Sequence, residues 1–120
     1  MYQRKKEEYL DCGIEVAAKV FGGRWKPCIL DAIYHGMRRP SEMHRYIPAA
    51  TPRVINLQLK ELEQHKVVYK KVYATVPLKT EYFLTEAGMG IMPVIKQMDE
   101  WGYAHRHLVK TENTDAVSCL

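Results

Sequence analysis

Residues 49–66 read AATPRVINLQLKELEQHK and predict the helix around which the rest of the chain is arranged. Thr51 is a good N-cap, and Pro52 suits the first helical position, where its missing N–H costs nothing. At 100° per residue, one face of this helix is apolar and carries Ile55, Leu59 and Leu62. The other face carries Arg53, Asn56, Leu57, Lys60 and Gln64. An amphipathic surface helix has the same pattern as a helix that reads DNA, so the surrounding sequence has to separate the two interpretations.

Length and composition favour one compact domain. The chain has 120 residues, of which 47% are hydrophobic, and this is too short for two independent cores. No run approaches the roughly 18 apolar residues of a membrane span, and the N-terminus lacks the apolar stretch of a signal peptide. We therefore expect a cytoplasmic protein. The cysteines at 12, 28 and 119 form no C-x-x-C pair, so no metal and no cofactor are expected.

Basic charge is concentrated around the Thr51 helix. The net charge of the whole chain is +4, but residues 38–79 contain nine Lys or Arg and three Glu, a net of +6. A basic block beside a polar helix face suits a polyanion, although an ordinary solvated face can also carry several lysines.

The elements before the Thr51 helix favour a helix-turn-helix. A first helix is predicted from Asp11, its N-cap, to about Phe21, and a second begins near Lys26-Pro27. A short third helix is predicted from Ser41, its possible cap, to Tyr46. A short helix, a tight turn and a longer helix with a polar face are the parts of a helix-turn-helix, whose second helix enters the major groove.

After the Thr51 helix the period changes from helical to alternating. Residues 67–73 and 80–84 are rich in β-branched and aromatic residues and predict a hairpin, with Pro77 in its connection. A basic hairpin in this place is a wing. The sequence thus predicts a mainly α fold with a small β-hairpin wing, a winged helix-turn-helix.

Thr85 can cap a long last helix. Beyond Pro93 its apolar residues follow 3, 4 spacing, like a coiled-coil seam: Ile91, Val94, Met98, Trp101, His105 and Leu108. The strip can cover the domain's own core or pair two subunits, and we favour pairing because so small a domain has little core to absorb Trp101. Residues 1–10 are expected to form a flexible arm, residues 11–109 the domain, and residues 110–120 a disordered tail.

With these motifs in place, the sequence resembles the HxlR-type branch of MarR-like winged-helix transcriptional regulators. The resemblance covers residues 12 to 103 in one order: Cys12, GGRWKPCIL at 22–30, Gly36-x-x-Arg39, Glu42-Met43, Arg45, Ile47-Pro48, LKELE at 59–63, VYATVPLKTEYFLTEAG at 72–88, Pro93 and Trp101-Gly102. The chain departs from the family at four places: Gly13 for Pro, Pro40 for Phe, Ala49-Ala50 for Gly-Ile, and Lys66 for the Gly that ends the recognition helix.

The resemblance implies a homodimer that binds a palindromic operator in double-stranded DNA, with no catalysis. It places the first and last helices at the dimer interface: Ile14, Ala18, Phe21, Val94, Met98, Trp101, His105 and Leu108. It also implies that a small electrophile or oxidant acts on Cys12, at the start of a helix, where unpaired N–H groups favour a negative charge and hence the reactive thiolate. The alternative is that Cys12 is only a small buried residue.

The expected DNA contacts come from the recognition helix, the basic block and the wing: Arg38, Arg39, Ser41, Thr51, Arg53, Asn56, Leu57, Gln58, Lys60, Lys70, Lys71 and Lys79. Two other classes of function compete with this one. A winged helix can instead bind an acidic protein partner, which the salt dependence of DNA binding would separate. A cysteine enzyme is disfavoured because no nucleophile signature accompanies Cys12 or Cys28.

Overall fold

The structure, a computed structural model, describes residues 12–109. The predicted arm at 1–10 and the predicted tail with Cys119 lie outside this range. Within it, no helix has both the length and the apolar character that a membrane crossing requires. The first described helix begins at Gly13 with Cys12 as its N-cap residue, so the predicted cap at Asp11 is wrong.

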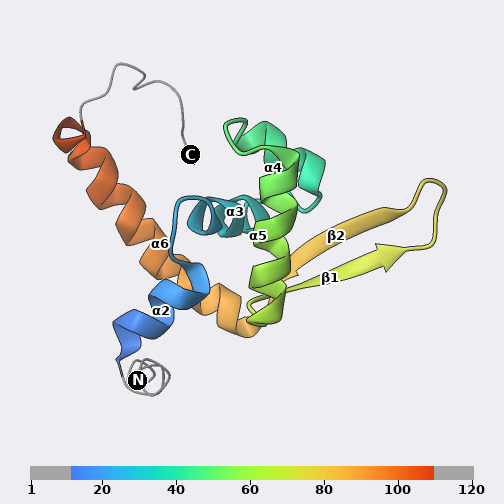
Figure 1. The fold of residues 1–120 in the computed structure, drawn as a ribbon, viewed down its shortest axis with the longest axis horizontal. Coiled ribbons are helices and arrows are strands. Elements are labelled where there is room, and N and C mark those ends of the chain that lie inside the picture. The colour runs from blue at the N-terminus through green and yellow to red at the C-terminus, as the bar shows by residue number, and fades with distance from the viewer. Residues whose placement is uncertain (1–11, 110–120) are drawn as a thin grey trace, which may run out of the picture.

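The described elements follow the winged-helix order shown in Figure 1. They are α2 (Gly13–Phe21), α3 (Lys26–Tyr34), α4 (Pro40–Tyr46), α5 (Pro52–Gln64), β1 (Val68–Tyr73), β2 (Lys79–Leu84), α6 (Glu86–Ala104) and the short 3-10 helix η1 (Arg106–Leu108). Helix α3 packs against α4, α5, α6 and β2, so it is the centre of the fold. The hairpin of β1 and β2 projects from the helical body on the side opposite to the far end of α6 (Figure 1). The predicted fold class is confirmed.

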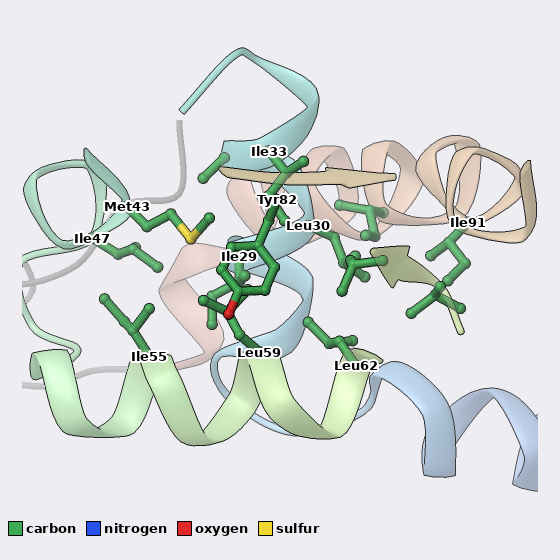
Figure 2. Close-up of a cluster of buried hydrophobic side chains, with 14 of the residues drawn as sticks. Ile29, Leu30, Ile33, Met43, Ile47, Ile55, Leu59, Leu62, Tyr82 and Ile91 are labelled. Carbon is green, nitrogen blue, oxygen red and sulfur yellow. The ribbon is translucent and has the colours of Figure 1, made fainter. Parts of the chain in front are cut away.

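Helix α5 starts and packs as its sequence predicts. The Thr51 side-chain oxygen accepts the Val54 N–H at 3.2 Å and caps the helix. Figure 2 shows Ile55, Leu59 and Leu62 pointing from α5 into the core, where all three are fully buried. Complete burial of each such side chain stabilises the fold by about 1.5–3 kcal/mol, so the packing fixes which face of α5 remains exposed.

Helix α4 begins one residue earlier than predicted. Pro40 occupies its first position, Arg39 is the N-cap residue, and Ser41 lies inside the helix, so the predicted Ser41 cap is wrong. The fixed φ of proline suits the first helical position and moves the start to Pro40. The Glu42 carboxylate accepts the backbone N–H groups of Arg38 and Arg39, at 3.0 and 3.1 Å. A glutamate three residues into the helix thus replaces the serine cap.

The hairpin is antiparallel and is anchored at its base. Its register runs from Val68 opposite Leu84 to Tyr73 opposite Lys79. Val68 and Tyr82 are buried in the core, and the Tyr82 N–H donates to the Arg38 carbonyl at 2.8 Å. These contacts join the wing to the loop that precedes α4.

The chain turns from α5 into the wing through Lys66, whose φ is +62°. This left-handed conformation is costly for a residue with a Cβ, which explains why glycine is usual at this position in the family that the sequence resembles. Thr85 secures the turn, because its hydroxyl donates to the Lys66 carbonyl at 2.8 Å and accepts the Gly88 N–H at 3.1 Å. The same side chain caps α6, as predicted.

We expect Lys66→Gly to raise the free energy of unfolding by about 0.5–1 kcal/mol, because glycine removes the left-handed penalty and loses only part of the gain through its greater backbone entropy. Urea denaturation monitored by circular dichroism measures the change. Lys66→Ala is the matched control, since alanine lacks the lysine side chain but keeps the Cβ. Equal stability of the glycine and alanine variants would contradict this explanation.

Helix α6 ends before the end of the predicted apolar strip. It stops at Ala104, with His105 as its C-cap residue, and Leu108 lies in η1. His105 Nδ1 lies 2.8 Å from the Trp101 carbonyl oxygen, and its ring stacks on the Trp101 ring at 4.2 Å. A side chain that bonds a carbonyl of the last turn favours helix termination. The continuous seam from Ile91 to Leu108 is therefore wrong in its last two positions.

Candidate nucleic-acid interface

The outward face of α5 is exposed and mostly polar. Arg53, Asn56 and Lys60 are exposed, Gln58 is partly buried, and Leu57 is about half exposed although it is apolar. The Asn56 side-chain amide donates to the Pro52 carbonyl at 3.0 Å, which orients it along the helix axis and leaves its side-chain oxygen as an acceptor. Hydrogen-bonding and apolar groups on one exposed helix face are what base edges in the major groove require.

An ion pair joins α5 to α3 beside this face. Lys26 Nζ of α3 donates to Glu61 Oε1 of α5 at 2.5 Å. The hydrogen bond and charge of Lys26 hold the pKa of Glu61 below its usual value. The Glu61 carboxylate is thus neutralised by α3, beside the face that carries Arg53.

The start of α4 adds a second polar region. Arg39, Ser41 and Thr51 are exposed, and the Arg38 guanidinium lies 4.7 Å from the centre of the Phe83 ring. Because α4 precedes α5 in the helix-turn-helix, Arg39 and Ser41 lie at the start of the element that crosses the phosphate backbone when the second helix occupies the groove, whereas Thr51 lies at the start of that second helix.

The wing separates its basic residues onto two faces. Lys70 lies 3.9 Å from Glu63 Oε1 of α5, while Lys71 lies 5.1 Å from the Phe83 ring centre on the opposite face. Lys79 shares the face of Lys71 and lies 4.7 Å from the Tyr73 ring centre. Successive side chains of a strand point to opposite faces of the sheet, so the neighbours Lys70 and Lys71 must lie on different faces. Lys71 and Lys79 therefore share one face of the hairpin with Glu81, which lies opposite Lys71 and leaves that face basic overall, whereas Lys70 belongs to the side of α5.

Aromatic rings under these cations were missed by the sequence analysis. The Tyr69 and Phe83 rings stack at 5.4 Å, opposite each other in the sheet register, and Tyr73 lies on the same face. A cation over an aromatic face is attracted by the ring quadrupole, so the rings hold Arg38, Lys71 and Lys79 in place. The pairing of Tyr69 with Phe83 could have predicted this aromatic face, but only with knowledge of the strand register.

The residues predicted for the dimer interface divide into two sets. Ile14, Ala18, Val94, Met98 and Trp101 are exposed, with Trp101 at 61%, and they leave apolar surface on α2 and α6. Phe21 instead packs against the core of its own chain. Ile91, the first residue of the predicted strip, is buried in that core. Cys12 is the N-cap residue of α2 and an exposed free thiol, with no side-chain capping bond.

A groove of about 820 Å³ lies between α3 and α6, lined partly by Asp31, Met98 and Asp99. The Tyr46 hydroxyl of α4 donates to Asp31 Oδ2 at 3.0 Å, and burial together with this bond raises the pKa of Tyr46 to about 12. Burial, and then the charges of Asp31 and Glu100, raise the pKa of Asp99. The groove therefore places Asp31 of α3, which is bonded to Tyr46 of α4, on the same surface as Asp99 of α6.

Within residues 12–109, no group of three or more His, Cys, Asp or Glu side chains is placed to hold a metal ion.

The chain is similar to known regulators over most of its length. The HxlR-like helix-turn-helix family pattern matches residues 20–110. The HTH-type transcriptional regulator YybR of Bacillus subtilis is 37% identical over 106 residues, which cover 88% of this chain and 85% of that protein. The solved structure of the redox regulator HypR in its oxidized form is 40% identical, with a TM-score of 0.73, over 78% of this chain and 97% of that one. Diamide-treated YodB of B. subtilis is 30% identical, with a TM-score of 0.64, over 78% and 94%.

The family pattern spans the helix-turn-helix, the wing and α6, the same elements that carry the polar face of α5 and the basic face of the hairpin. The chain therefore belongs to the HxlR-like helix-turn-helix family of transcriptional regulators.

Proposed function

We propose that this transcriptional regulator binds a palindromic operator as a homodimer, with α5 in the major groove and the wing on the flanking backbone. The exposed polar face of α5 carries the proposal, because Arg53 and Asn56 present donors and acceptors beside Leu57 on a helix whose other face is completely buried. The cations of the wing and of α4 supply phosphate contacts on both sides of that face: Arg38, Arg39, Lys71 and Lys79.

Selection of bound sequences from random double-stranded DNA tests this function. We expect an inverted repeat whose half-sites lie about one helical turn, roughly 34 Å, apart. Enrichment of no sequence, or of a single half-site without a repeat, would contradict it. A winged helix that serves only a protein partner gives the first of these results.

The exposed apolar surface of α2 and α6 supports pairing of two chains. Val94, Met98 and Trp101 lie at 4, 3 spacing on α6, and Ile14 of α2 is 81% exposed. A two-fold axis through α6 would bring the same strip from each chain together, as an isologous interface requires. We assign α2 and α6 to the dimer interface.

We also propose that Cys12 regulates DNA binding. Its thiol is exposed, it starts the α2 helix that carries Ile14, and two similar structures are named as a redox regulator and as a diamide-treated protein. A quinone would add to the Cys12 sulfur through a new S–C bond, and the quinone ring would become a hydroquinone. An oxidant such as diamide would take two electrons as that sulfur joins a second thiol in a disulfide.

Modification at the start of α2 would shift one subunit against the other and move the two recognition helices out of register. Helix α6 packs on α3, and the hydrogen bond from Tyr46 to Asp31 joins α3 to α4 of the helix-turn-helix. Regulation would then act through the geometry of the dimer, without a change in the base-contacting residues.

We expect quinone treatment to lower operator affinity about tenfold in the native protein and to leave Cys12→Ser unchanged, since couplings between sites are typically 5–150-fold. Fluorescence anisotropy of labelled operator measures the affinity, and mass spectrometry locates the adduct. Equal loss of binding in the native protein and in Cys12→Ser would exclude Cys12 as the sensor.

A further inference from the structure

The connection between β1 and β2 exposes apolar side chains at the far end of a basic hairpin. Val76 is fully exposed and Leu78 is 70% exposed, with Pro77 between them. Figure 1 shows that this connection is the part of the hairpin farthest from the helical body. The proposed DNA contacts of the wing use only its lysines and leave these side chains without a role.

Two hydrogen bonds of Thr75 restrain the tip. The Thr75 hydroxyl donates to the Pro77 carbonyl at 2.7 Å, and the Thr75 N–H donates to the Tyr73 carbonyl at 2.8 Å. Strand pairing continues up to Tyr73 opposite Lys79. An apolar group that is already ordered loses little conformational entropy when it binds, so this tip is suited to insertion.

The charges behind the tip identify the surface that it meets. Lys71 and Lys79 lie on one face of the hairpin, and each is supported by an aromatic ring. With Glu81 on the same face, the net charge behind the apolar tip is still positive, which is complementary to the phosphates on either side of a DNA groove. Six residues per strand give the wing a length of about 20 Å, enough to extend beyond the groove that α5 occupies.

We propose that Val76 and Leu78 form an apolar wedge that enters the minor groove beside each half-site, partly unstacks one base step and bends the operator. This inference rests on the proposed function. Apolar side chains inserted between base steps kink the duplex toward the major groove. Pyrimidine–purine steps such as TA unstack most easily, so the wedge selects such a step at a position that no side chain of α5 reaches.

The test uses the operator obtained from random DNA, with the fluorescent adenine analogue 2-aminopurine at the flanking step. Unstacking of this base raises its emission, and we expect the native protein to raise it. The variant V76S/L78S removes the wedge but keeps every charge. We expect it to leave the emission at the level of free DNA and to bind the operator about tenfold more weakly, with the same salt dependence.

Val72→Ser is the matched control, because Val72 is also an exposed valine of the wing, 57% exposed, but lies within the paired part of β1 and not in the connection. It is expected to behave as the native protein in both measurements. Neither Val76 nor Leu78 is part of the core, so the melting temperature of V76S/L78S should equal that of the native protein.

An operator bound by the native protein without a rise in emission, and with equal affinity in V76S/L78S, would overturn the wedge and leave the proposed function intact. The same result is expected if the tip serves a protein partner. Failure of the native protein to prefer its operator over random DNA would instead refute the proposed function and the wedge together.

Discussion

Replacing both Met98 and Trp101 with glutamate is expected to convert the protein to a monomer and to lower operator affinity at least about 100-fold. Both side chains lie on the exposed strip of α6, so opposed carboxylates in a two-fold interface would repel each other and lose their apolar partner surface. A dimer binds its second half-site intramolecularly, which typically contributes 10²–10⁴ in affinity, and a monomer loses this contribution.

Sedimentation velocity at micromolar concentration and operator titration measure the two effects. Tyr103→Glu is the control, since it places a carboxylate at an exposed aromatic of α6 that lies outside the 4, 3 strip. It should remain dimeric. A native protein that sediments as a monomer, or a double variant that remains dimeric, would refute the interface.

Arg53→Ala is expected to weaken operator binding by about 1–3 kcal/mol per half-site and to relax sequence preference at the contacted base pair. Arg53 is exposed on the first turn of α5, from which the N-terminal residues of a recognition helix reach base edges. Asn56→Ala should have an effect in the same range, because its side-chain oxygen remains available as an acceptor.

Lys71→Ala removes the same charge from the wing and serves as the comparison. It should weaken operator and random duplexes alike, and lower the salt slope by about 2 for a dimer, because two phosphate contacts are lost. Competition binding on both duplexes at several salt concentrations separates the two variants. If Arg53→Ala leaves operator affinity unchanged, α5 does not read the bases.

Local chemistry made most of the fold predictable. Thr51 and Pro52 specify the start of α5 by their own chemistry, and the helical spacing of Ile55, Leu59 and Leu62 specifies its buried face. The alternation after residue 66 predicted the hairpin for the same reason. Each of these signals depends on neighbours only a few residues away.

The misplaced features depend on competition or on distant partners. The start of α4 was predicted one residue late because Pro40 takes the helix start that Ser41 was expected to cap. The end of α6 was predicted too late because the His105 ring bonds the Trp101 carbonyl. The division of Lys70 from Lys71, and the rings that hold the wing cations, required the register of β1 on β2. The groove at Asp31 required the packing of α6 on α3, which no local pattern encodes.

Under the proposed function, this regulator reads a specific DNA sequence through α5. The most direct test compares the affinity of the native protein for its selected operator with that for a scrambled duplex of the same composition, at physiological salt. We predict at least about a 10³-fold preference for the operator, the lower end for sequence-specific regulators. Equal affinity for the two duplexes would contradict the claim.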